Sequence, residues 1–155
     1  MTSMTIRWQL ILCAALLALC SPAVQGQETP AIKWRTDYNA ARKEAEAKNL
    51  PVLIEFVRPN CPPCAKMEQV TFVDPRVART LNEKFIPLKI NGQEDVHLAS
   101  RLQISLYPTL VLAGPDGRIA QTLIGYQEAD ALNDHLQRLL ATDRKSTRLN
   151  SSHRH

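Results

Sequence analysis

The sequence contains few cysteines, and their positions exclude two common ways of holding a small domain together. Of the four, Cys13 and Cys20 lie in an apolar N-terminal segment, so residues 27–142 keep Cys61 and Cys64 alone. A small exported scaffold stapled by disulfides needs more cysteines at wider spacing. A structural zinc site needs four ligands, whereas residues 27–142 have one Cys-x-x-Cys pair and two histidines. We therefore expect neither a disulfide framework nor a bound metal or other cofactor.

The sequence also lacks an apolar run long enough to span a membrane. Its apolar N-terminal run, residues 10–19, is too short, since a bilayer core requires roughly 20 residues. Arg7 precedes this run and small residues follow it up to Gly26, which is the layout of a secretory signal peptide. We expect residues 1–26 to be cleaved and the protein to be periplasmic or otherwise exported from a bacterium, without stable membrane insertion. A short uncleaved anchor and a lipid anchor on Cys20 are the alternatives.

The chain has no excess charge of either sign once its two ends are set aside. The whole sequence has 19 Lys and Arg against 15 Asp and Glu, but residues 27–142 carry 14 of each kind. This balance gives no support for a nucleic-acid partner. Residues 143–155 have no apolar period and resemble one reading frame of a common sequencing adaptor, so we expect a non-native read-through tail. The alternative is a basic tail that binds nucleic acid or a membrane.

Over residues 27–142 the sequence alternates between helical and strand-like patterns. Apolar runs predict buried strands at 52–57 and 85–90, and further strands are predicted at 109–112 and 118–124. Helical spacing predicts helices at 37–48, 61–70, 75–85, 94–102 and 128–140. Early strands that alternate with helices imply parallel pairing through right-handed crossovers. The turn Gly114-Pro-Asp-Gly117 predicts a final antiparallel hairpin. We therefore expect one α/β domain with a mixed central sheet and helices on both faces.

The main chemical motif is Cys61-Pro62-Pro63-Cys64, which follows a predicted buried strand and opens a predicted helix. Cys61 then falls at the helix N-terminus, where unpaired N–H groups and the helix dipole favour a thiolate. The thiolate attacks in disulfide exchange, and the two-residue gap lets Cys64 reach back to resolve a mixed disulfide. We therefore predict Cys61 as the nucleophile and Cys64 as the resolving thiol. The gap holds no histidine, which favours a reductant over an oxidant.

A zinc half-site and a structural disulfide are the alternatives for the cysteine pair, although a disulfide that closes so small a loop would stabilise little. Glu55 is the only charged residue in its apolar strand, six residues before Cys61. If Glu55 is buried, its pKa is raised and its carboxyl could carry a proton to or from Cys64. The alternative is a glutamate at an edge that faces water.

Residues 32–140 resemble the thioredoxin superfamily nearly end to end. The matching residues are Trp34, the segments 51–56, 61–64 and 107–109, Asp116-Gly117 and Gly125. Residues 67–77 are most similar to the exported branch, and in particular to the C-terminal domain of the bacterial thiol:disulfide interchange protein that sends electrons into the periplasm. The resemblance implies a thioredoxin fold and a reductase of periplasmic protein disulfides, which we expect to be a monomer. It also implies Glu55 as the buried acid and Pro108 as a cis proline that faces the cysteines.

The chain departs from this family at two positions. Asn60 stands where the family usually has tryptophan, and Glu55 stands where it usually has aspartate. We expect Asn60, Pro62, Tyr107 and Pro108 to contact the substrate, so the first departure bears on partner recognition. We expect no transmembrane relay domain in this protein, so the resemblance implies a separate membrane protein as the electron donor. Two other functions are left open: a binding or chaperone module with a structural Cys-x-x-Cys, and the same chemistry run as an oxidase or isomerase.

Overall fold

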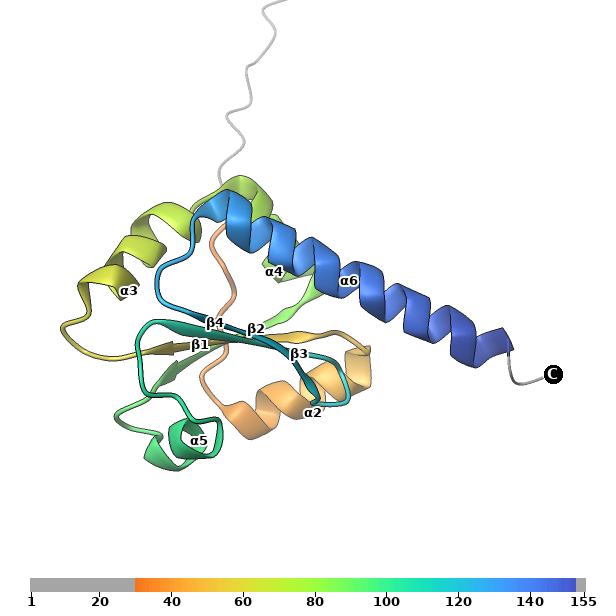
Figure 1. The fold of residues 1–155 in the computed structure, drawn as a ribbon, viewed down its shortest axis with the longest axis horizontal. Coiled ribbons are helices and arrows are strands. Elements are labelled where there is room, and N and C mark those ends of the chain that lie inside the picture. The colour runs from red at the N-terminus through yellow and green to blue at the C-terminus, as the bar shows by residue number, and fades with distance from the viewer. Residues whose placement is uncertain (1–29, 153–155) are drawn as a thin grey trace, which may run out of the picture.

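The computed structural model describes residues 30–152, with side chains described over residues 30–142 (Figure 1). The predicted signal peptide, residues 1–26, lies outside the described residues. Within the described range, no helix combines the length and the apolar character that a membrane span requires.

The core of the fold is a four-stranded sheet in the order β2-β1-β3-β4. Its strands are β1 (Val52–Val57), β2 (Ile86–Asn91), β3 (Thr109–Ala113) and β4 (Ile119–Ile124). The predicted parallel pairing holds for β1 and β2, while β3 runs antiparallel to both β1 and β4. The mixed sheet with a hairpin at its end is therefore confirmed.

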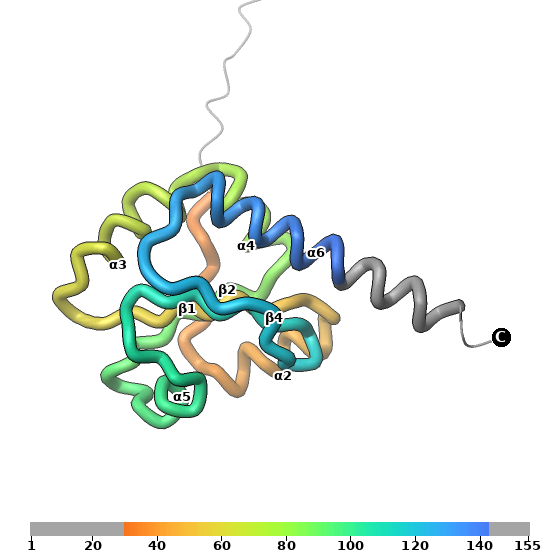
Figure 2. The backbone as a smooth tube through the Cα atoms, viewed as in Figure 1, coloured from red at the N-terminus to blue at the C-terminus, as the bar shows by residue number. Residues whose placement is uncertain are grey.

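Helices cover both faces of the sheet (Figure 1, Figure 2). One face carries α2 (Tyr38–Lys48) and α5 (Val96–Arg101), and the other carries α3 (Pro62–Lys66), the π-helical turn η2 (Met67–Thr71), α4 (Pro75–Lys84) and α6 (Ala129–Ser152). Side chains alternate along β1, so Val52, Ile54 and Phe56 pack toward α2, whereas Leu53 packs toward α4 and α6. By the same alternation Glu55 points to the face that carries α3.

Local sequence signals set most helix ends. Asp37 caps α2 by accepting from Ala40 N, and Asp74 caps α4, which has Pro75 in its first turn. The last helix is longer than predicted, since α6 continues past Leu140 to Ser152. Residues 141–152 contain neither glycine nor proline, so no strong stop signal interrupts the helix.

Candidate active site

The cysteine pair is placed by a tight turn between β1 and α3. Asn60 adopts a left-handed backbone conformation (φ 53°), which asparagine tolerates better than most residues. Cys61 is the N-cap of α3, with an extended backbone, and its Sγ accepts from the backbone N of Cys64 at 3.3 Å. Pro62 and Pro63 fill the first helical turn, where a missing N–H group costs little. The predicted position of Cys61 at the helix N-terminus is confirmed.

Cys61 and Cys64 form a disulfide with an S–S distance of 2.07 Å and a Cα–Cα distance of 5.2 Å. The pair lines a surface hollow of about 600 Å³ whose other lining residues are Val57, Arg58, Asn60, Pro62, Ala65, Glu68 and Lys89. A hollow of about 670 Å³ between α4 and α6 is larger but contains no cysteine, so size alone does not mark the reactive site. The disulfide therefore forms part of the wall of a surface hollow.

Glu55 is fully buried on the strand that leads to the cysteines, so the buried alternative is the one the structure shows. Its Oε2 lies 3.5 Å from Lys89 Nζ, and neither carboxyl oxygen has a hydrogen-bond partner among the described residues. Burial raises the pKa of Glu55 to about 8, and the positive charge of Lys89 opposes this shift only in part. Near neutral pH the Glu55 carboxyl is therefore largely protonated, and its ionised form is a stronger base than an ordinary carboxylate.

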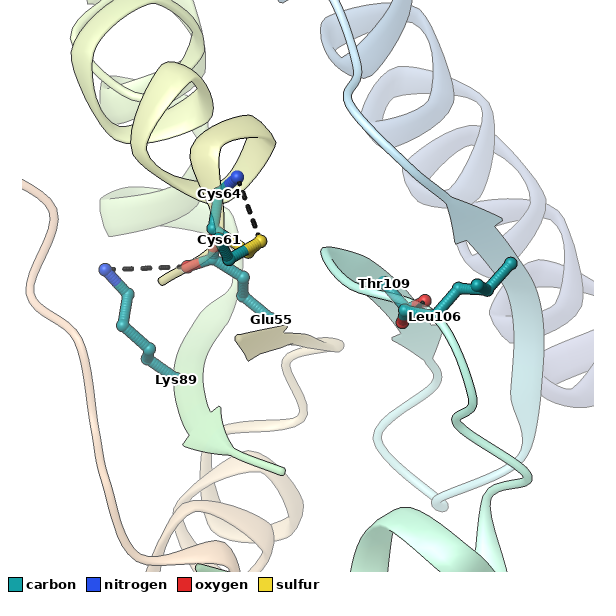
Figure 3. The surroundings of a disulfide bond; sticks show 6 residues. All are labelled: Glu55, Cys61, Cys64, Lys89, Leu106 and Thr109. Carbon is teal, nitrogen blue, oxygen red and sulfur yellow. Dashed lines mark hydrogen bonds and ion pairs between the residues drawn. A yellow bond between two sulfur atoms is a disulfide. The ribbon is translucent and has the colours of Figure 1, made fainter. Parts of the chain in front are cut away.

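Lys89 links Glu55 to the surface. Its ammonium group pairs with both Glu55 and Glu68 and lies 4.5 Å from the centre of the Trp34 ring (Figure 3 shows the Glu55–Lys89 pair beside the disulfide). Glu68 comes from η2, where the backbone N of Phe72 bonds to Met67 O at 2.9 Å in the wider π-helical pattern. Glu68 and Lys89 both line the hollow, so charged groups connect the buried carboxyl to solvent.

Neither Lys89 nor Glu68 is among the residues predicted from the sequence. One signal was available for Lys89, which is the only charged residue in the apolar strand β2, as Glu55 is in β1. The parallel register places these two residues side by side. Glu68 carried no comparable signal, because its place depends on the π-helical turn.

Replacing Lys89 by methionine is expected to raise the pKa of Glu55 above about 8, because the substitution removes the cation that favours the charged carboxylate. A carbon-13 NMR titration of the Glu55 carboxyl measures this shift. Lys66→Met is the matched control, since Lys66 lies on α3 but contacts Tyr126 and Glu128 rather than Glu55. An unchanged Glu55 titration in Lys89→Met would contradict the assigned coupling.

The Tyr107–Pro108 peptide bond is cis, as the resemblance implied. The antiparallel register pairs Phe56 with Thr109, so Pro108 lies at the C-terminal end of β1, the end that leads to Cys61. The backbone N of Gly125 donates to Pro108 O at 2.8 Å and fixes the loop on its other side.

The structure brings the predicted site residues to one end of the sheet. Asn60, Pro62 and both cysteines line the hollow, and Glu55 lies buried in the adjoining strand. Tyr107 and Pro108 precede β3 at the same end of the sheet, but neither lines the hollow, and Pro108 is buried. Within residues 30–142, no group of three or more His, Cys, Asp or Glu side chains is arranged to hold a metal ion.

Comparison with known proteins places this geometry in a family. The family model of the thioredoxin-like domain matches residues 38–140. A thiol:disulfide interchange protein DsbD of Salmonella typhimurium is 30% identical over 97 residues, which cover 59% of this chain and 17% of the relative. The DsbD protein of Ralstonia nicotianae is 26% identical over 125 residues, which cover 78% of this chain and 21% of the relative. The chain thus spans about a fifth of the length of these relatives.

Solved structures agree with the family match. A thioredoxin from Thermus thermophilus superimposes with a TM-score of 0.67 at 23% identity, and the match covers 81% of this chain and 100% of that one. A putative disulphide-isomerase from Bacteroides thetaiotaomicron gives a TM-score of 0.61 at 27% identity, over 69% of this chain and 91% of that one. A thioredoxin fold that carries the Cys61–Cys64 pair makes the protein a thiol–disulfide oxidoreductase. The chain belongs to the thioredoxin-like family.

Proposed function

We propose that the protein reduces disulfide bonds of exported proteins through a mixed disulfide on Cys61. The observation that carries this proposal is the Cys61–Cys64 disulfide at a helix N-terminus, beside an open hollow. The reducing direction is supported by the absence of a histidine between the cysteines. An exported, periplasmic location is supported by the signal-like pattern of residues 1–26 and by the resemblance of residues 67–77 to the exported branch.

The reaction balances over two electrons. The Cys61 thiolate attacks one sulfur of the substrate disulfide, which forms a mixed disulfide and releases the other substrate sulfur as a thiolate. Cys64 then loses its proton and attacks Cys61 Sγ, so the substrate leaves fully reduced and the Cys61–Cys64 disulfide forms. We assign to the ionised form of Glu55 the uptake of the Cys64 proton in this step. Lys89 then gives one of its own protons to Glu68 at the surface and takes the proton from Glu55, so that the proton reaches solvent. A dithiol donor, proposed to be a separate membrane protein, returns two electrons to the pair.

The substrate is proposed to lie across the hollow and the adjoining loop. Asn60 and Pro62 are exposed at the rim of the hollow, while Tyr107 is half-buried next to Pro108. A polypeptide segment on this surface would bring its disulfide to Cys61 without a deep pocket. The asparagine at position 60 offers a smaller and more polar contact than the tryptophan usual in the family.

The reduction potential of the pair tests the direction of electron flow. We expect a value nearer to about −270 mV, as in thioredoxin, than to about −120 mV, as in a strong oxidant. Equilibration with glutathione or dithiothreitol buffers, followed by alkylation and mass spectrometry, measures it. A value close to that of the strong oxidant would establish the oxidase direction. A value below about −300 mV, combined with no reduction of insulin, would establish a structural disulfide in a binding module.

A further inference from the structure

Gly92, the residue after β2, lies in close contact with the Tyr107 side chain. A Cβ atom added at Gly92 would overlap the Tyr107 hydroxyl and lie 2.6 Å from Cε1 and 2.8 Å from Cζ, closer than real Cβ contacts. Its backbone does not account for the glycine, since the described glycines with positive φ are Gly117 and Gly125. A side chain at position 92 would therefore push the Tyr107 ring out of the place that it occupies.

Arg58 covers the same ring. The Cζ atom of its guanidinium group lies 5.6 Å from the centre of the Tyr107 ring, within the range of a cation–π contact. The Gly92 backbone meets the hydroxyl end of the tyrosine, and Arg58 lies over its face. The ring is thus held at two places by residues that no part of the proposed chemistry uses.

Both contacts are anchored to the segment that carries the cysteines. The backbone N of Gly92 donates to Val57 O at 2.9 Å, and Arg58 follows Val57 directly. Arg58 also lines the hollow beside Cys61. The end of β1, which leads to Cys61, therefore sets the position of the Tyr107 ring. Because Pro108 follows Tyr107, it also sets the position of the loop that contains both residues.

We propose that Gly92 is a positioning residue for substrate binding: it leaves room for the Tyr107 ring, which with Arg58 fixes the Tyr107–Pro108 loop relative to Cys61. This inference rests on the proposed function, because the loop is taken to bind the protein substrate. The cysteine chemistry itself does not involve Gly92. Displacing the ring should therefore weaken substrate binding and leave the reactivity of Cys61 unchanged.

The test is a double-mutant cycle between Gly92→Ala and Tyr107→Ala, with insulin as substrate and dithiothreitol as reductant. We expect Gly92→Ala to raise KM about tenfold, because small misplacements of a binding group cost much of its effect, with kcat changed less than twofold. The rate of Cys61 alkylation by iodoacetamide should stay within twofold of the wild type. In the Tyr107→Ala background, Gly92→Ala should add less than a twofold change in KM, since the new methyl group no longer meets a ring.

Gly114→Ala is the matched control, because a Cβ there meets chiefly the end of the Asp116 side chain, in the turn between β3 and β4. It should leave KM and kcat unchanged. Equal effects of Gly92→Ala in both backgrounds, or a slowed alkylation of Cys61, would show a general structural role and overturn the proposal. An unchanged KM in Gly92→Ala would overturn it as well.

A second readout does not depend on activity. The Gly125 amide donates to Pro108 O, so its NMR cross-peak reports the position of the loop. We expect Gly92→Ala to shift this cross-peak relative to the wild type. In the Tyr107→Ala background, Gly92→Ala should leave the cross-peak where it lies in Tyr107→Ala alone. If the wild type fails to reduce insulin, the proposed function fails, while this cross-peak still decides whether Gly92 positions the loop. An unshifted cross-peak in the single variant contradicts the positioning.

Discussion

Replacing Cys61 by serine is expected to lower disulfide reduction by more than ~10³-fold, which is the scale of a lost nucleophile. Cys64→Ser should instead leave the first attack intact and stop the reaction at the mixed disulfide. The asymmetry follows from position. Cys61 is the N-cap of α3, and the backbone N–H of Cys64 already points at its sulfur. The same N–H group and the helix dipole would stabilise a Cys61 thiolate once the disulfide is reduced.

Exposure alone would not have separated the two cysteines, since Cys61 is 9% and Cys64 6% exposed. The two variants are therefore the direct comparison, each incubated with insulin and resolved on a non-reducing gel. Cys64→Ser should accumulate a mixed disulfide with insulin that dithiothreitol reduces, and Cys61→Ser should form no such complex. A complex that forms only with Cys61→Ser would reverse the assigned roles. Full insulin reduction by Cys61→Ser would contradict the proposed function.

The sequence predicted the elements of this fold because their signals are local. Asp74 and Pro75 mark the start of α4, and the apolar run at 52–57 marks a strand, whatever the rest of the chain does. The antiparallel pairing of β3 with β1 is a long-range property that no local pattern announces. The sequence analysis ended α6 too early, at Leu140, because the apolar periodicity stops there. The helix continues because residues 141–152 contain no glycine or proline to end it.

The site shows the same division between local and long-range information. The cysteine pair could be predicted from its spacing and its place between a strand and a helix. The burial of Glu55 could not, because both faces of β1 are covered and the strand has no polar face for comparison. The contact between Gly92 and Tyr107 could not be predicted either, since the two residues are 15 positions apart in the sequence. The surroundings of the cysteine motif thus depend on contacts between distant segments, which the motif itself does not predict.

Replacing Glu55 by glutamine is expected to make the oxidised protein more stable at alkaline pH. The pKa of this carboxyl is raised from 4.5 to about 8 by burial. A raised pKa means that the folded state holds its proton more tightly than the unfolded state. The stabilisation from this proton is complete below pH 4.5 and is lost as the pH rises through about 8. A shift of this size corresponds to roughly 3–5 kcal/mol over that window.

Glutamine keeps the shape of the side chain and does not titrate, so Glu55→Gln removes this pH dependence. Urea denaturation of the oxidised proteins at about pH 5 and about pH 9 measures this dependence. The difference in the free energy of unfolding between wild type and variant cancels the titration of all other groups. The wild type should lose stability relative to the variant between these two conditions.

Glu44→Gln is the matched control for this measurement. Hydrogen bonds from Arg35 and Lys48 lower the pKa of Glu44 to about 2, so its contribution is lost only as the pH falls from 4.5 through that value. Between about pH 5 and about pH 9 the Glu44→Gln and wild-type stabilities should therefore run parallel, separated by a constant offset from the loss of the partly exposed Arg35–Glu44 ion pair. Parallel curves for Glu55→Gln as well would mean that the pKa of Glu55 is not raised. A carboxylate with an ordinary pKa is too weak a base to take the Cys64 proton efficiently near neutral pH, so the assignment of proton transfer to Glu55 would fall while the cysteine chemistry stood.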